Sequence, residues 1–237
     1  MRFLTRPEVK ARFDGKTVAI VGGGPSAAHN PVGFIDSHDI VIRINNYKTT
    51  GPRTGRRTDV FYSFFGSSIR KRAEELMADG VTLCMNKCPD AHPIESEWHR
   101  QHNKMVGVDF RPHFRRREGW WFCDTYIPTA DEFLVGFNLL NKRMPTTGFA
   151  AILDVLSFKP KSIYLTGFDF YLTRMHNLNE RWRPNNPGDP IAHHPKRERE
   201  WLVKNMGNYP INVDPVMKRQ LRPILGKMRR EQALIEA

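Results

Sequence analysis

Residues 17–30 read TVAIVGGGPSAAHN. An apolar, β-branched run that stops at glycines, a proline and a serine is typical of a parallel strand that opens onto a phosphate-binding turn. Gly22, Gly24 and Ala27 also fit the G-x-G-x-x-A spacing of the dinucleotide-binding fingerprint. The stretch therefore predicts a nucleotide site, and the residues that follow decide which nucleotide it holds.

Further apolar runs alternate with stretches of helical periodicity along the chain. Strands are predicted at 17–21, 39–44, 58–62, 81–85 and 162–166, and helices at 67–80, 131–143, 146–158 and 197–207. Such alternation favours an α/β fold with a Rossmann-like, doubly wound and mostly parallel sheet. With 237 residues, of which 40% are hydrophobic, the chain can bury one sizeable core, so we expect a single domain over residues 1–237.

Two long segments show no clear periodicity. Residues 92–126 are rich in His, Arg, Pro and Trp, and residues 172–192 lie between the last clear strand and a late helix. Long irregular segments inside a compact domain are often lids or binding loops. We expect both to be lid-like excursions over the sheet.

The formal net charge of +12 indicates an anionic partner, although a basic surface can also be merely solvated. Basic residues gather in IRKR, RPHFRRR and PKRER and in the C-terminal segment 214–237. That segment also carries Val, Met, Leu and Ile, which predicts either contact with an anionic membrane or a helix packed on its own domain. A nucleic-acid-binding protein is one alternative that the charge leaves open.

The cysteines and histidines predict no bound metal. Cys84, Cys88 and Cys123 form no pair of C-x-x-C motifs, and the EWHRQH stretch is not H-E-x-x-H. No window approaches the roughly 18 apolar residues that span a bilayer. We expect a cytoplasmic protein, peripheral at most to the inner face of the membrane.

A conventional dinucleotide site is disfavoured by the residues around the first turn. A Rossmann turn feeds a helix of several turns, and an acid at the end of the second strand binds the ribose. Here Pro31 and Gly33 should end any helix after little more than one turn, and the second strand ends in Arg43 and Asn45. A flavin or NAD oxidoreductase therefore stays an alternative that lacks both features.

The segment FIDSHDIVIRINNYKTTGPRTGRRTDVFY (34–62) resembles the large sialylmotif of animal-type sialyltransferases. MPTTGFAAILDVLSFKPKSIYLTGFDFY (144–171) resembles their small sialylmotif and is also similar to a block of the bacterial sialyltransferases. HHPKRE (193–198) gives the histidine and acid of the very small motif. The blocks stand in the family's order, although Gly23 replaces its asparagine and the cysteines that join the motifs in animal enzymes are absent.

The resemblance implies a GT-A-like variant of the Rossmann fold and a set of donor-binding residues. Matching positions imply donor contacts at Gly22, Gly24, Ser26, Asn45, Thr146, Thr147, Gly148 and Tyr171. The first turn would line the CMP phosphate and ribose, the second turn would receive the sugar carboxylate or the nucleotide, and the tyrosine would bind the leaving phosphate. His193 would be the base.

The chemistry of a CMP-linked keto-acid sugar needs donors for the phosphate, a cradle for the carboxylate and a base. His176 is a further candidate donor to the phosphate, and Asp169 follows a strand's carboxyl end, where ligands gather. His194 is an alternative base, although it stands where a helix N-cap is expected, before Pro195.

These features predict an inverting, metal-independent glycosyltransferase. It would move sialic acid or Kdo from a CMP donor to a hydroxyl of a glycan or glycolipid, and we expect a bacterial surface glycan. A metal is not expected because the sequence has no D-x-D pair and the donor carries one phosphate. No cofactor is expected, the CMP-sugar being a substrate.

Overall fold

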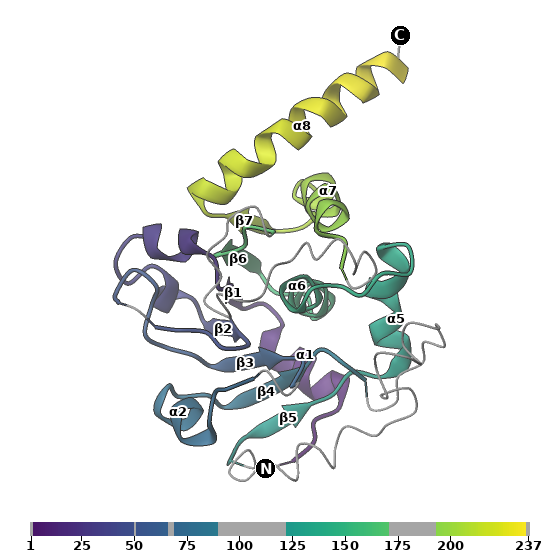
Figure 1. Cartoon of the computed structure of the whole chain (residues 1–237). Coiled ribbons are helices and arrows are strands. Elements are labelled where there is room, and N and C mark those ends of the chain that lie inside the picture. Colours follow the sequence, from purple (N-terminus) through teal and green to yellow (C-terminus); the bar gives the residue numbers. More distant parts are fainter. Residues whose placement is uncertain (1, 50, 66–68, 90–121, 171–192, 236–237) are drawn as a thin grey trace.

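The computed structural model describes residues 2–49, 51–65, 69–89, 122–170 and 193–235 (Figure 1). Its centre is a seven-stranded sheet in the order β5-β4-β3-β2-β1-β6-β7, and every neighbouring pair is parallel. The strands are β1 (Thr17–Val21), β2 (Ile40–Ile44), β3 (Val60–Ser63), β4 (Leu83–Asn86), β5 (Asp124–Tyr126), β6 (Ser162–Thr166) and β7 (Ile211–Val213). The predicted α/β fold with a doubly wound sheet is confirmed.

The strand order reverses beside β1. The chain passes outward from β1 through β2 to β5 and then returns to place β6 on the other side of β1. Val21 pairs with Arg43 of β2 and with Thr166 of β6, so the turns that follow these three strands leave the sheet at one level. In open α/β sheets, ligands bind in the crevice at such a switch point.

Helices cover both faces of the sheet, so the strands bury the side chains that point to either face. The larger core joins Val18 and Ile20 of β1 to one helical layer, and Ala19 and Val21 face the opposite layer. The first layer contains α1 (Arg6–Phe13), α6 (Thr147–Ser157), α7 (Pro195–Asn205) and the start of α8 (Pro215–Ile235). The second contains the 3₁₀ helices η1 (Pro25–His29) and η2 (Ile35–Ser37) and helix α2 (Ala73–Ala78), while α5 (Ala130–Leu139) buries Phe133 and Phe137 in a small cluster of its own.

Helix α8 is attached to the domain only through its first turns. Asp214 accepts the backbone N–H of Met217 at 2.8 Å and so caps the helix. Met217 and Leu221 are buried in the main core, and Ile224 and Leu225 pack against it. The part of the helix beyond these residues projects from the body of the molecule (Figure 1). None of the helices in the described ranges combines the length and apolar character needed to cross a membrane.

The first and last predicted strands are found at the predicted residues, and the other three shift by one or two positions. The sequence did not predict α1, β5 or β7. Asp124–Tyr126 form the edge strand β5, so this end of segment 92–126 belongs to the sheet and not to an excursion. Residues 92–121 and 172–192, the remainder of the predicted lids, lie outside the described residues.

Candidate active site

The glycines of the first turn allow two backbones to approach closely. The N–H of Gly22 donates to the carbonyl of Thr166 at 2.8 Å, and the N–H of Gly24 donates to the carbonyl of Gly167 at 2.7 Å. A Cβ on Gly22 would lie 2.4 Å from the oxygen of Gly167, and a Cβ on Gly24 would lie 2.7 Å from it. These two N–H groups therefore join the turns after β1 and β6 and are not available to a ligand.

The predicted donor ligand Ser26 points its side chain into the protein. Its hydroxyl donates to Asp214 Oδ2 at 2.6 Å and accepts the N–H of Gly167 at 2.9 Å. Thr166 Oγ1 donates to the same carboxylate oxygen at 2.9 Å. The hydroxyl of Ser26 thus links η1, β6 and the start of α8. Within the described chain, the backbone N–H groups of Gly23 and Ser26 have no partner, and they are the candidate donors that this turn retains.

The short helix after the turn matches the argument against a dinucleotide. Helix η1 spans five residues, and Asn30 follows it in an extended conformation. A Rossmann site would have a helix of about three turns here. At the end of β2 stands Asn45, with no acid beside it to bind a ribose.

Asn45 adopts a left-handed backbone conformation with φ of 52°, which asparagine tolerates better than most residues. Its Oδ1 accepts a hydrogen bond from Ser63 Oγ at 3.0 Å, and its Nδ2 has no partner among the described residues. A cavity of about 180 Å³ lies nearby, between the glycine turn and residues Arg43, Tyr47, Lys48 and Thr54. The buried guanidinium of Arg43 thus lies beside this cavity, and its Nη1 has no hydrogen-bond partner in the described structure.

The second predicted nest lies at the N-terminus of α6. The side chain of Thr146 accepts the N–H of Phe149 at 3.2 Å and caps the helix. The N–H groups of Thr147 and Gly148 make no hydrogen bond within the described residues, so both can face an anion. A Cβ on Gly148 would lie 2.4 Å from Cε1 of Phe168, which places the turn after β6 directly against this helix end.

His193 is fixed by one hydrogen bond and is held neutral. Its Nδ1 lies 2.9 Å from the carbonyl oxygen of Met144. Because a carbonyl only accepts, Nδ1 carries the proton and Nε2 keeps its lone pair. Burial, and then the charge of Lys87, lower the pKa of His193 to about 4. His194 instead caps α7, since its Nδ1 accepts the N–H of Arg197 at 3.4 Å, as its place before Pro195 predicts.

Glu198 joins the predicted base to the second nest. It is 1% exposed, and its two oxygens accept the N–H of Thr146 at 2.7 Å and the hydroxyl of Thr146 at 2.8 Å. Burial raises the pKa of Glu198 to about 7. Glu198, the acid of the very small motif, therefore holds α7 against the start of α6. His193, which four residues separate from Glu198, lies just before α7 and is fixed by its own bond to Met144.

Sequence reasoning missed Lys87, which follows β4 and is 6% exposed. Its charge acts on both His193 and Glu198, and burial lowers its own pKa. The signal that could have revealed it is a lysine directly after the apolar strand LCMN, at the sheet edge where ligands gather. Asp169, the predicted residue after β6, is 5% exposed near the first turn, and its backbone nitrogen would lie 3.5 Å from a Cβ on Gly24.

Comparison with solved structures finds sialyltransferases. CstII from Campylobacter jejuni, in complex with the substrate analogue CMP-3FNeuAc, matches at 16% identity and a TM-score of 0.54, over 84% of this chain and 81% of CstII. The α-2,3-sialyltransferase Cst-I from the same organism matches at 16% identity and a TM-score of 0.52, over 84% of this chain and 76% of Cst-I. A mammalian sialyltransferase, in complex with Gal-beta-1-3GalNAc-ortho-nitrophenol, matches at 18% identity and a TM-score of 0.51, over 86% of this chain and 71% of the mammalian enzyme.

The chain has the sialyltransferase fold. This confirms, at the level of fold, the resemblance that residues 34–62 and 144–171 indicate. No protein-family model matches the chain, and neither does any curated protein.

The sialyltransferase fold gathers most of the predicted residues at the carboxyl edge of the sheet. The contacts join the first turn, the turn with Asp169, the start of α6 and the His193 segment. Tyr171 and His176 lie outside the described residues. In the part of the chain that the structure describes, no three His, Cys, Asp or Glu side chains are grouped to hold a metal ion, and Cys84, Cys88 and Cys123 are free thiols.

Proposed function

We propose that this protein is a glycosyltransferase that moves a sialic-acid-type keto-acid sugar from a CMP donor to a hydroxyl of a glycan. One observation carries the proposal. The imidazole of His193, with Nδ1 bound to the carbonyl of Met144 and Nε2 unbonded within the described residues, stands beside the helix end where Thr147 and Gly148 present unpaired N–H groups. A base and an anion cradle are thus neighbours, on a fold whose solved examples include CstII in complex with CMP.

In the proposed reaction, the bond between the anomeric carbon and the CMP phosphate breaks as the acceptor oxygen bonds to that carbon. The phosphate keeps the electron pair and leaves as CMP. Backbone donors at Gly23 and Ser26 and the side-chain amide of Asn45 would stabilise its charge, as would Tyr171 and His176. Thr147 and Gly148 would bind the carboxylate of the sugar.

His193 would take the proton of the acceptor hydroxyl. A pKa of about 4 keeps the ring neutral at physiological pH, so Nε2 is ready to accept. The bond from Nδ1 to Met144 fixes the tautomer and the ring plane, which a base must have before the acceptor arrives. Attack on the face opposite CMP would invert the anomeric configuration.

A metal ion has no evident task in this scheme. A donor with one phosphate needs less charge compensation than a diphosphate, and the sequence has no D-x-D pair to hold a divalent ion. Activity measured in a chelator and in magnesium tests this part of the proposal. Equal rates are expected, and a rate that requires magnesium would overturn it.

Thermal stabilisation by nucleotides tests the donor class. CMP should raise the melting temperature more than CDP, UDP, GDP, NAD or FAD, with and without chelator. A preference for a diphosphate nucleotide would overturn the proposal and favour the dinucleotide alternative. Turnover of CMP-sialic acid against CMP-Kdo then identifies the sugar.

His193→Ala and His194→Ala form a matched pair for the base. His193→Ala should lose turnover by about 10²-fold or more and keep its affinity for CMP, since a general base contributes about that much. His194→Ala removes only a helix cap, so it should lose stability by about 1 kcal/mol and keep turnover. The opposite pattern would make His194 the base.

The membrane part of the prediction rests on α8. Its projection from the domain and the basic and apolar residues of segment 214–237 support peripheral contact with an anionic bilayer, where a glycolipid acceptor would lie. Co-sedimentation with phosphatidylglycerol vesicles should fall when residues 226–237 are removed, and truncation at this point keeps the buried Met217 and Leu221. Equal binding of both chains would remove this part.

A further inference from the structure

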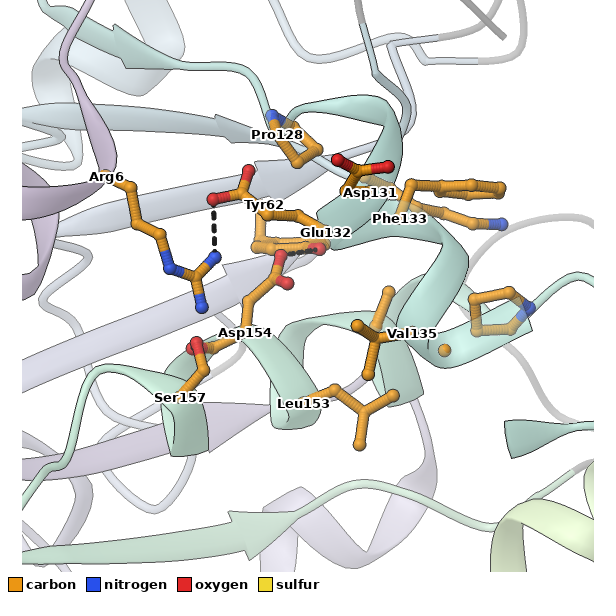
Figure 2. A pocket seen from close by; sticks show the side chains of 14 residues that line it. Arg6, Tyr62, Pro128, Asp131, Glu132, Phe133, Val135, Leu153, Asp154 and Ser157 are labelled. Atoms are coloured by element: carbon orange, nitrogen blue, oxygen red, sulfur yellow. Dashed lines mark hydrogen bonds and ion pairs between the residues drawn. The ribbon is translucent and has the colours of Figure 1, made fainter. Parts of the chain in front are cut away.

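A groove of about 320 Å³ runs along helix α6 on the face of the sheet that carries the main core (Figure 2). Tyr62 of β3, Phe133 and Val135 of α5 and Leu153 of α6 line it, and Figure 2 shows these side chains around the same opening. Pro145, before the first residue of α6, and Ser157, its last residue, both belong to the lining. Since a helix of 11 residues is about 16 Å long, the groove is elongated and of a size that small ligands occupy.

The charged groups at the Ser157 end are satisfied within the protein. Arg6 forms an ion pair with Glu132 at 2.7 Å, and Tyr126 donates to the other oxygen of that carboxylate at 2.8 Å. Asp154 differs, because Tyr62 donates to its Oδ2 at 2.6 Å and its Oδ1 has no partner among the described residues (Figure 2). The groove therefore contains one acceptor oxygen that is ready for a hydroxyl.

Lys87 lines the groove with an ammonium group that has no hydrogen-bond partner in the described chain. The side chain belongs to a residue that is 6% exposed, and burying an unpaired charge is costly. Glu198 attracts it electrostatically, but both oxygens of Glu198 already accept bonds from Thr146. An anion placed in the groove would supply the missing partner.

The Lys87 end of the groove adjoins the proposed base. Pro145 lines the groove, and its two neighbours in the chain hold the catalytic segment: the carbonyl of Met144 binds His193, and Thr146 binds Glu198. A ligand that occupies this end therefore lies next to the residues proposed to activate the acceptor hydroxyl.

We infer that this groove binds an acidic saccharide and serves as the acceptor subsite. The carboxylate of the sugar would pair with the ammonium of Lys87, a sugar hydroxyl would donate to Asp154 Oδ1, and the apolar lining would cover the C–H faces of the ring. The acceptor role rests on the proposed function, whereas the saccharide site does not.

The test compares two ligands that differ in one group, 4-nitrophenyl β-D-glucuronide and 4-nitrophenyl β-D-glucoside, by calorimetric titration of the full chain. The glucuronide should bind at least about tenfold more tightly, because hydrogen bonds to charged groups contribute that much or more. Lys87→Met should abolish the preference. Lys161→Met should keep it, because Lys161 is exposed and lies far from the groove, just before β6. Lys87→Met should also melt no lower than the wild type, because methionine fills the same space without a charge to bury.

Lys87→Arg and Asp154→Asn guard against a trivial loss of structure. The arginine variant should retain the preference for the glucuronide, and Asp154→Asn should weaken both ligands equally. Equal binding of the two ligands by the wild type, or a preference that survives in Lys87→Met, would overturn the saccharide site. If CMP fails to bind while the preference and its loss in Lys87→Met are found, the proposed transferase function fails and the saccharide site stands.

Discussion

Replacing Gly22 by alanine tests whether the first turn is glycine-rich because two backbones meet there. The added Cβ would lie 2.4 Å from the carbonyl oxygen of Gly167 and 2.9 Å from its carbonyl carbon. Real Cβ atoms essentially never come within 3.0 Å of a heavy atom outside their own and the adjacent residues. The two turns would therefore have to separate by at least 0.6 Å, the difference between 3.0 and 2.4 Å. Both neighbours are backbone, which cannot move aside as a side chain can.

The separation should weaken the contacts that join β1 to β6. The hydrogen bond from Gly22 to Thr166 is 2.8 Å long and that from Gly24 to Gly167 is 2.7 Å, and each contributes about 0.5–1.5 kcal/mol. Overpacking adds about 1–3 kcal/mol. We therefore expect Gly22→Ala to lose about 3 kcal/mol or more of unfolding free energy. In a domain of this size, that corresponds to a fall in melting temperature of about 6–12 °C.

The matched control is Gly23→Ala in the same turn. A Cβ on Gly23 would meet no heavy atom within 4 Å, and its backbone is not left-handed, so its stability should stay within about 1 kcal/mol of the wild type. Thermal and urea unfolding of both variants gives the comparison. Similar melting temperatures for the two would show that close approach at the switch point is not the reason for Gly22.

Three further outcomes follow from the buried polar groups. As pH rises from 4.5 to 7, the wild type should lose free energy of unfolding relative to Glu198→Gln. The reason is that the pKa of Glu198 is raised to about 7 in the folded protein, so ionising this carboxyl costs more there than in the unfolded chain. Unfolding curves of both proteins at each pH measure the difference. As pH falls through 6.5, kcat/KM should not decline, because the pKa of His193 is about 4 and its ring stays neutral. A decline near pH 6.5 would mean that another group is the base. Ser26→Ala should lose about 1–3 kcal/mol while CMP affinity is kept, because its hydroxyl serves Asp214 and Gly167; a calorimetric loss of CMP binding at unchanged stability would contradict this.

The elements that the sequence predicted best are those with a strong local signal. Strand β1 ends at a glycine turn and β6 lies between a proline and a glycine, so both were found at the right residues. Helix α6 begins at a threonine cap, and α7 begins with a proline after His194, which is the N-cap expected from its position. The roles of these segments in the fold could be predicted because local sequence and tertiary structure agree.

Strands β5 and β7 had no such signal. Each has three residues and lies at an edge of the sheet, so it becomes a strand only by pairing with its single neighbouring strand. In β5, Thr125 also bonds to the backbone of Arg2 and Leu4, which are distant in the sequence. The direction of the Ser26 hydroxyl was equally beyond local reasoning, because its partner Asp214 lies 188 residues away. Only the folded chain brings these groups together.

The contacts between residues 193–198 and the start of α6 give a structural role to His193 and Glu198, which four residues separate. A base must be neutral and oriented, and a sugar carboxylate must find N–H groups at a fixed place. Glu198 contributes to both, because its two bonds to Thr146 hold the start of α6, while His193 lies two residues before the helix that carries Glu198. Burial, and then the charge of Lys87, keep His193 unprotonated by lowering its pKa, and the ammonium of Lys87 has no hydrogen-bond partner among the described residues. Burying that charge costs free energy, which the anionic group of the proposed saccharide ligand would offset.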